Sequence, residues 1–137
     1  GAVRLKISFA GFGDDAGTLT KFITVRIVAF AGLEILAMPY PRSANSVSDV
    51  TLNLIGCSDM YQKAEAALYA VTTSLLEDGS SVRELLEVTS NSTFQNGNTN
   101  VIALDGSLMT GIRPGTATIT GSWNGQQSPF LDMIVTD

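Results

Sequence analysis

The chain has 137 residues, of which 45% are hydrophobic and 15% charged, and its formal net charge is −5. This length suits one domain with a substantial core, and the acidic balance excludes the basic footprint with which proteins bind nucleic acid or anionic membranes. Histidine is absent and cysteine occurs once, which excludes Ser-His and Cys-His catalysis, a cysteine zinc site and an internal disulfide. We therefore expect no enzyme, no cofactor and no metal site.

The low-charge composition also bears on location. Because few side chains are charged, the surface must consist largely of Thr, Ser, Asn and Gly, a balance typical of extracellular or cell-surface β proteins. No stretch approaches the roughly 20 apolar residues of a membrane helix, so we expect no membrane span. The chain begins with Gly1, which suggests a processed polypeptide or part of a longer one. The single Cys57 is expected to be a small buried apolar residue, and a disulfide bridge to another chain is the alternative.

The first part of the chain alternates between apolar and polar residues. Such a period of two predicts a strand with one wet face. The apolar members of this first strand are Val3, Leu5, Ile7 and Phe9. A Gly/Asp loop is expected over residues 11–17, and further strands over residues 22–29 and 32–38.

The middle of the chain combines a proline-containing segment with a segment that has both helical and strand features. Pro39 and Pro41 flank Tyr40, and proline at alternate positions cannot join a central ladder, so we expect an extended connector with an exposed tyrosine. Alternation resumes over residues 50–55. Residues 60–76 combine helical spacing with a β-rich end, and we expect an irregular or helical start followed by a strand from about residue 67.

The last part of the chain consists of short alternating segments separated by turn signals. Strands are predicted over residues 82–89, 101–104 and 130–135, and a polar loop over residues 90–100. On residues 117–123 the apolar face is Ala117, Ile119, Gly121 and Trp123, and an Asn124-Gly125 turn follows. Many short strands with frequent turns indicate an antiparallel sandwich or barrel.

The two ends of the chain resemble one another. Residues 1–11 align with residues 115–125, with glycine, alternation, serine and an aromatic residue in phase, and Phe22 to Ile27 aligns with Phe130 to Val135. This partial repeat predicts that residues 1–31 form a hairpin like the last strands of a preceding module and that residues 32–137 form a complete module. A two-stranded hairpin is barely stable alone, so we expect it to pack on its own module or to complete a neighbouring sheet.

The second half of the chain also resembles a known family. The turn around Asp78-Gly79, the strand end Val88-Thr-Ser-Asn91 and the corner Gly111-Ile-Arg-Pro-Gly-Thr-Ala-Thr-Ile119 resemble the bacterial immunoglobulin-like group 2 (BIG2) domain. The resemblance covers residues 75–137 well and residues 32–74 loosely, because residues 43–69 contain an extra segment. It implies an all-β, immunoglobulin-like antiparallel β-sandwich, here preceded by an N-terminal hairpin. It further implies tandem modules in surface proteins, adhesins and extracellular (mastigoneme-like) filaments, with no catalytic residues.

Few residues suggest a specific site. Asn91-Ser92-Thr93 is an N-glycosylation sequon in the expected polar loop. The expected assembly contacts are Val3, Leu5, Ile7, Phe9, Phe22 and Tyr40. Trp123 is expected to pack in the core or between modules, like its counterpart Phe9.

Two functions follow from these features. The first is a structural subunit or repeat segment of an extracellular filament or surface array, joined by its N-terminal strands to other copies or to tandem neighbours. The second is an adhesin module that binds glycans or proteins through its loops.

Overall fold

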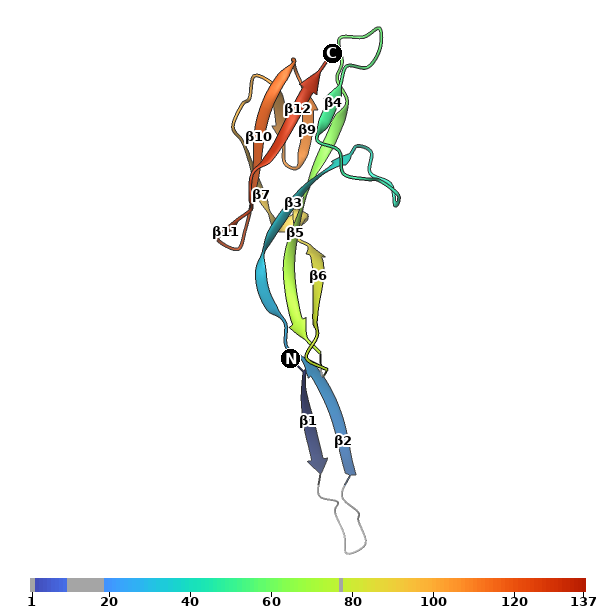
Figure 1. Cartoon of the computed structure of the whole chain (residues 1–137), viewed down its shortest axis with the longest axis vertical. Helices are drawn as coiled ribbons and strands as arrows, with labels where there is room; N and C mark the ends of the chain where they lie inside the picture. Colours follow the sequence, from blue (N-terminus) through green and yellow to red (C-terminus); the bar gives the residue numbers. More distant parts are fainter. Residues whose placement is uncertain (1, 10–18, 77) are drawn as a thin grey trace, which may run out of the picture. The chain divides into compact units, whose positions relative to one another are not determined.

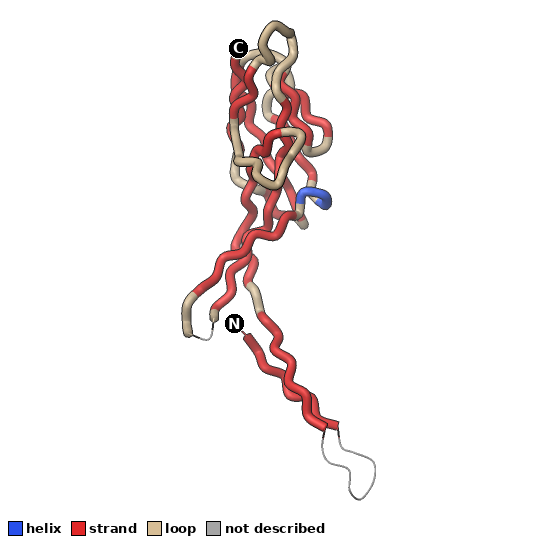
Figure 2. The backbone as a smooth tube through the Cα atoms, turned by 90° about the vertical axis from the view of Figure 1, so that its right-hand side faces the viewer, coloured by secondary structure: helices blue, strands red, loops and turns tan. Residues whose placement is uncertain are grey.

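The computed structural model describes residues 2–9, 19–76 and 78–137; the glycine- and aspartate-rich segment 11–17 therefore lies outside the described residues. The described part is almost entirely β-structure, and its one helical segment is a short 3₁₀ turn, η1 (Thr89–Asn91) (Figures 1 and 2). None of its helices has the length and hydropathy required to cross a membrane.

The chain divides into two compact units, residues 1–31 with 72–84 and residues 32–71 with 85–137. The strands are β1 (Ala2–Phe9), β2 (Leu19–Arg26), β3 (Ala29–Pro39), β4 (Thr51–Asn53), β5 (Lys63–Leu75), β6 (Ser81–Glu87), β7 (Thr93–Asn96), β8 (Ile102–Asp105), β9 (Leu108–Gly111), β10 (Gly115–Trp123), β11 (Gln126–Gln127) and β12 (Leu131–Thr136).

The second unit is built on a β-sandwich of two sheets. One sheet has the order β3-β5-β9-β8, with β6 also paired to β5, and the other has the order β11-β10-β12-β4, with β7 paired to β10. Immunoglobulin sandwiches place strands A, B, E and D in one sheet and C, F and G in the other. The sheets have these orders when β3, β5, β7, β8, β9, β10 and β12 are taken as strands A to G. The short β4 pairs in parallel with β12. The all-β, immunoglobulin-like sandwich predicted from the sequence is therefore observed.

The core lies between the two sheets. Along β10 the inward positions Ala117 and Ile119 are 3% and 0% exposed, as the alternation predicts. Trp123 is partly buried and packs against this core, which confirms a packing role. The largest fully buried side chains are Leu52, Leu68, Ile102, Met109, Ile119, Met133 and Val135.

Gly121 on β10 marks a close approach between the sheets. A Cβ atom at this position would lie 2.9 Å from Leu68 Cδ1 and 3.2 Å from Phe94 Cε1. Two residues earlier, the Ile119 side chain is fully buried in the core. At Gly121 the Leu68 side chain occupies the corresponding space. Any side chain at position 121 would require its neighbours to move.

Two segments differ from the sequence expectations. The expected irregular or helical start of residues 60–76 is wrong, because β5 runs without interruption from Lys63 to Leu75. Ala64, Ala66, Leu68 and Ala70 occur at every second position and are all at most 2% exposed. Small residues at this spacing pack between sheets, and pairing with β9 and β3 overrides local helix propensity.

The second difference is β7, which forms inside the expected polar loop over residues 90–100. It pairs with β10 from Ile119 to Ser122 and contributes Phe94 to the edge of the core. The Asn96 side chain donates a hydrogen bond of 2.6 Å to the carbonyl oxygen of Ile102. A strand with one apolar residue has too little alternation to be recognised from its sequence.

The first unit contains the N-terminal hairpin. Strands β1 and β2 pair antiparallel over eight residue pairs, from Ala2–Arg26 to Phe9–Leu19, and form a two-stranded sheet (Figure 1). The remainder of this unit comprises the start of β3, the end of β5 and the start of β6. Each hairpin strand therefore has one outer edge that no strand of the described chain covers.

Candidate functional site

One face of the β1–β2 hairpin is apolar and open. Val3 pairs with Val25 and Leu5 pairs with Ile23, so these four side chains share a face with Ile7. Each of the five is 38–47% exposed. We call these residues the hairpin face. A contiguous apolar patch of this kind marks an interaction surface more often than an ordinary solvent face.

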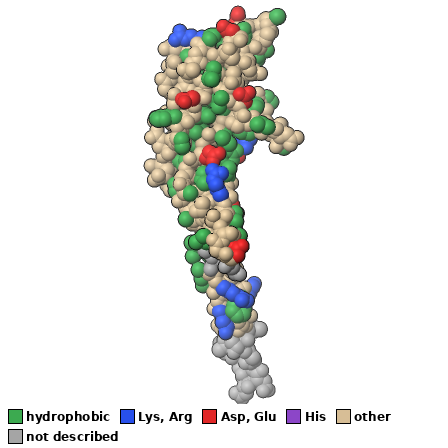
Figure 3. Space-filling model, in the orientation of Figure 1, with side chains coloured by type: hydrophobic (Ala, Val, Ile, Leu, Met, Phe, Trp, Pro, Cys, Tyr) green, Lys and Arg blue, Asp and Glu red, His purple; other side chains and the backbone are tan. Residues whose placement is uncertain are grey.

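The opposite face of the hairpin is basic and polar. The Arg4 guanidinium lies over the Phe22 ring, 4.1 Å from its centroid, a cation–π contact that holds an otherwise half-exposed aromatic ring. The hydroxyl groups of Ser8 and Thr20 lie 3.4 Å apart. In the view of Figure 3, Lys and Arg side chains surround hydrophobic ones on this hairpin. The two faces therefore differ in chemistry: the hairpin face is aliphatic except for Lys21, which stands opposite Ile7, and the other face carries Arg4, Lys6 and Phe22.

The hairpin has the same strand register as the last hairpin of the sandwich. Val3–Val25 and Leu5–Ile23 correspond, in the alignment of the chain ends, to Ala117–Met133 and Ile119–Leu131. Four consecutive residue pairs correspond in this way. They run from Ala2–Arg26 to Leu5–Ile23 in the hairpin and from Thr116–Ile134 to Ile119–Leu131 in the sandwich. The environments differ: the four sandwich residues are 0–8% exposed, whereas their hairpin counterparts are 40–47% exposed. The hairpin face thus has the residue pattern of a core face, but its side chains are exposed.

The expected assembly contacts occupy different places. Val3, Leu5 and Ile7 lie together on the hairpin face, and Phe22 lies on the opposite face beside Arg4. The side chain of Phe9 is outside the described part of the structure. Tyr40 belongs to the second unit and is 52% exposed.

Sequence reasoning missed two members of the hairpin face. Ile23 and Val25 stand opposite Leu5 and Val3. Their signal was the period of two within β2, which places them on the face that Phe22 does not share. Phe22, which was predicted as an assembly contact, lies on the other face of the same strand.

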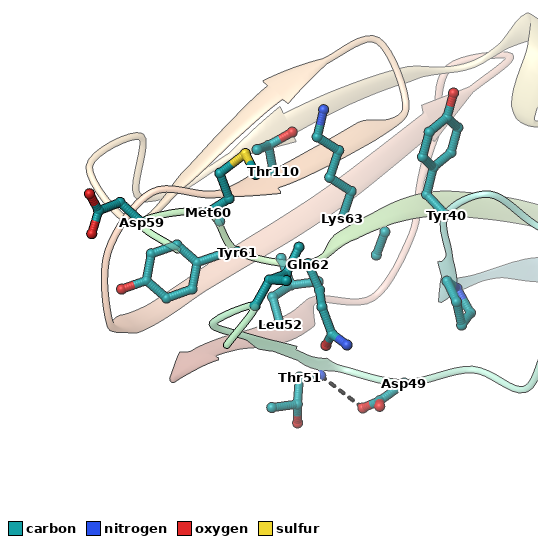
Figure 4. A pocket seen from close by; sticks show the side chains of 14 residues that line it. Tyr40, Asp49, Thr51, Leu52, Asp59, Met60, Tyr61, Gln62, Lys63 and Thr110 are labelled. Carbon is teal, nitrogen blue, oxygen red and sulfur yellow. Dashed lines mark hydrogen bonds between the residues drawn. The ribbon is translucent and has the colours of Figure 1, made fainter. Parts of the chain in front are cut away.

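A second feature is a pocket of about 600 Å³ in the sandwich unit (Figure 4). It lies beside the start of β5, where Gln62 accepts hydrogen bonds of 3.1 and 3.2 Å from the backbone and side-chain nitrogens of Asn53. The pocket combines aromatic, aliphatic, carboxylate and amide groups. Its lining residues are Pro39, Tyr40, Asp49, Thr51, Leu52, Ile55, Asp59, Met60, Tyr61, Gln62, Lys63, Ala64, Thr110 and Gly111.

Three polar side chains of this pocket, those of Tyr61, Gln62 and Asp49, are held by hydrogen bonds within the protein. The Tyr61 hydroxyl donates a 2.8 Å hydrogen bond to the Asp137 carboxylate, and this bond, together with the nearby negative charge, raises the pKa of Tyr61. Asp49 accepts the backbone N–H of Thr51 at 2.9 Å. Among the described residues no three acidic or cysteine side chains cluster as a metal site would require. The pocket has the chemistry of a binding surface with polar and aromatic groups.

The glycosylation sequon lies on the surface. Asn91 is exposed at the end of η1, and its backbone N–H donates to the Val88 carbonyl at 3.1 Å. Ser92 donates its hydroxyl to the same carbonyl at 2.6 Å. Thr93 begins β7 and is exposed. The amide side chain of Asn91 is therefore accessible to modification.

Arg42, in the connector after β3, forms an ion pair with Glu87 of β6. Arg42 follows the Tyr40–Pro41 segment and donates hydrogen bonds of 2.6 Å to Glu87 and 2.7 Å to the hydroxyl of Tyr69. The hydrogen bond to Glu87 raises the pKa of the guanidinium, opposed by slight desolvation. Both members of the ion pair are partly exposed, so its contribution to stability is small.

The expectation for the cysteine is wrong. Cys57 is exposed rather than buried, and it lies in a turn with a positive φ of 60°. Segment 56–60 is a loop between β4 and β5, and none of its residues is buried.

No model of a known protein family matches the chain, and a search of curated proteins gives no significant match.

Proposed function

We propose that this chain is a structural, non-enzymatic module of an extracellular filament or surface array, and that the N-terminal hairpin joins it to a neighbouring module. The observation that carries this proposal is the hairpin face, with five aliphatic side chains each 38–47% exposed. The BIG2-like corner Gly111 to Ile119 supports it, because that family consists of tandem sandwich modules. The Ser-, Thr- and Asn-rich composition supports an extracellular location.

Energetics favour covering this face. Burying an exposed aliphatic side chain contributes about 1.5–3 kcal/mol when burial is complete. The hairpin side chains are already about half covered, so roughly half of that remains available for each of the five. A free two-stranded hairpin is marginal in water. Association through the hairpin face therefore stabilises both the contact and the hairpin.

Charge favours a neighbour similar to the sandwich. The described strands of the hairpin carry Arg4, Lys6, Lys21 and Arg26 and no acidic residue, whereas residues 32–137 contain eleven Asp and Glu against four Lys and Arg. Opposite charges guide association and fix orientation. A neighbouring module of the same acidic kind would attract the hairpin.

Sedimentation velocity and electron microscopy of the chain test the proposal. We expect association that grows with concentration, up to elongated polymers, because the exposed aliphatic side chains of the hairpin face are buried when copies associate. Ile23→Asp places a charge on that face and should abolish association, whereas the matched control Thr24→Asp changes the opposite face and should leave it intact. A wild-type chain that stays monomeric at all concentrations would contradict the proposal.

The pocket at the start of β5 favours a second function, a glycan- or protein-binding module of an adhesin. Tyr40 offers a half-exposed aromatic ring, and Lys63, Asp59 and Thr110 supply polar groups around the same 600 Å³ space. Aromatic and hydrogen-bonding side chains in one concave site are typical of ligand pockets. A glycan array probed with wild type and Tyr40→Ala tests this alternative: binding lost in the variant supports it, and no binding by wild type contradicts it.

A further inference from the structure

We infer that the β1–β2 hairpin is the last hairpin, strands F and G, of a second immunoglobulin-like sandwich whose remaining strands come from a polypeptide segment other than residues 32–137. The inference deepens the proposed function, on which it rests, by naming the partner and the geometry of the contact. It depends on the strand register that the two hairpins share and on one difference in side-chain size, Ile7 in the first hairpin against Gly121 in the second.

The sandwich shows what such a hairpin requires. In β10–β12 the outer edge of β10 pairs with β7, and the outer edge of β12 pairs in parallel with β4. The inward face is covered from the other sheet, where Leu68 of β5 approaches Gly121. Within the described part of the chain, β1 and β2 pair only with each other, so no strand stands where β7 and β4 flank the sandwich hairpin. The side chains of the hairpin face are also exposed, whereas those of the sandwich hairpin are covered by the sheet of β5 and β9. The missing partner is therefore an immunoglobulin-like sandwich without its last hairpin.

This partner cannot be the sandwich of another copy, with the β1–β2 hairpin in the place of that copy's β10–β12 hairpin. The alignment places Ile7 at the position of Gly121. At Gly121 a single added carbon already lies 2.9 Å from Leu68 Cδ1 and 3.2 Å from Phe94 Cε1, and Leu68 is fully buried. An isoleucine there would need space that this core does not contain. The partner must therefore carry a residue smaller than leucine opposite Ile7.

A designed tandem polypeptide tests the inference with the natural chain intact. Residues 32–114, the sandwich without β10 to β12, are joined directly ahead of residues 1–137, and Leu68→Ala in the added copy makes room for Ile7. The probe is hydrogen exchange of the β1 and β2 amides, measured by mass spectrometry. We expect exchange at least about 100-fold slower than in the 137-residue chain, because a completed sandwich opens far less often than a free hairpin. Self-association should also disappear, since the hairpin face is then buried.

Matched variants in the natural part of the tandem sharpen the test. Ile23→Asp should remove the protection, because Ile23 corresponds to the buried Leu131. Thr24→Asp should retain it, since Thr24 corresponds to Asp132, which the sandwich tolerates on its outer face. Unprotected β1 and β2 amides in the tandem, or an added copy that stays unfolded beside the hairpin, would overturn the inference. Concentration-dependent assembly of the natural chain would still support the proposed function in that case.

A second measurement tests the size argument without the tandem. In the natural chain, Gly121→Ile should unfold the sandwich or lower its melting temperature strongly, and adding Leu68→Ala should restore folding. If Gly121→Ile alone is as stable as wild type, another copy could accept the hairpin, and the assignment to a segment other than residues 32–137 would be wrong.

Discussion

Replacing Gly121 by alanine tests how tightly the two sheets approach. The new Cβ would lie 2.9 Å from Leu68 Cδ1, 3.1 Å from Leu68 Cδ2 and 3.2 Å from Phe94 Cε1. Overpacking of a closed core costs about 1–3 kcal/mol. The loss of glycine's conformational freedom in the unfolded chain offsets about 0.5–1 kcal/mol of this. We expect a net destabilisation of about 1 kcal/mol, or a melting temperature lower by about 3–5 °C for a chain of this size.

Urea unfolding followed by fluorescence measures this change, because the chain has a single tryptophan, Trp123, two residues from the mutation. Gly56→Ala is the matched control: an added Cβ there meets nothing within 4 Å, so its midpoint should not fall. In a Leu68→Ala background Gly121→Ala should be neutral or stabilising, because its methyl group fills part of the new cavity. A cost that is the same in both backgrounds would refute the packing argument.

Three other substitutions test local features. Gly111→Ala should be more destabilising than Gly121→Ala, because its Cβ would lie 2.6 Å from Tyr61 Cβ, which cannot move without its backbone; equal unfolding midpoints would contradict this. The Ser80 hydroxyl and N–H donate to Asp78 and lower its pKa below the usual 3.8, so the stability it contributes is present above that pH and is lost as pH falls through the folded-state pKa. Ser80→Ala should raise this pKa in an NMR titration, and an unchanged value would show that the hydroxyl is not the cause. Expression in a secretory eukaryotic host should add a glycan that Asn91→Gln removes, seen as a mass shift; an unmodified wild type would count against the sequon.

The candidate site was only partly foreseeable from local pattern. Alternation identified Val3, Leu5 and Ile7, because a period of two places them on one face regardless of what covers it. Phe22, the other hairpin residue predicted from the described strands as an assembly contact, lies on the opposite face, where the Arg4 guanidinium covers its ring. Its neighbours Ile23 and Val25 were missed although they obey the same period. The pocket beside β5 had no local signature, because it draws residues from segments as distant as Pro39 and Thr110.

The sequence by itself determined the class of structure and most strand faces. Two patterns extend over only a few residues, the alternation of Ala117, Ile119 and Gly121 and the Asn124-Gly125 turn. They can therefore be recognised from the sequence alone. Tertiary structure alone decided that β5 is one continuous strand and that the polar residues of β7 form a strand against β10. It also decided that the face of Ile119 is buried while the equivalent face of Leu5 is open. The physical reason is that pairing and burial depend on residues far apart in the chain, whereas a period of two records only how each strand is pleated.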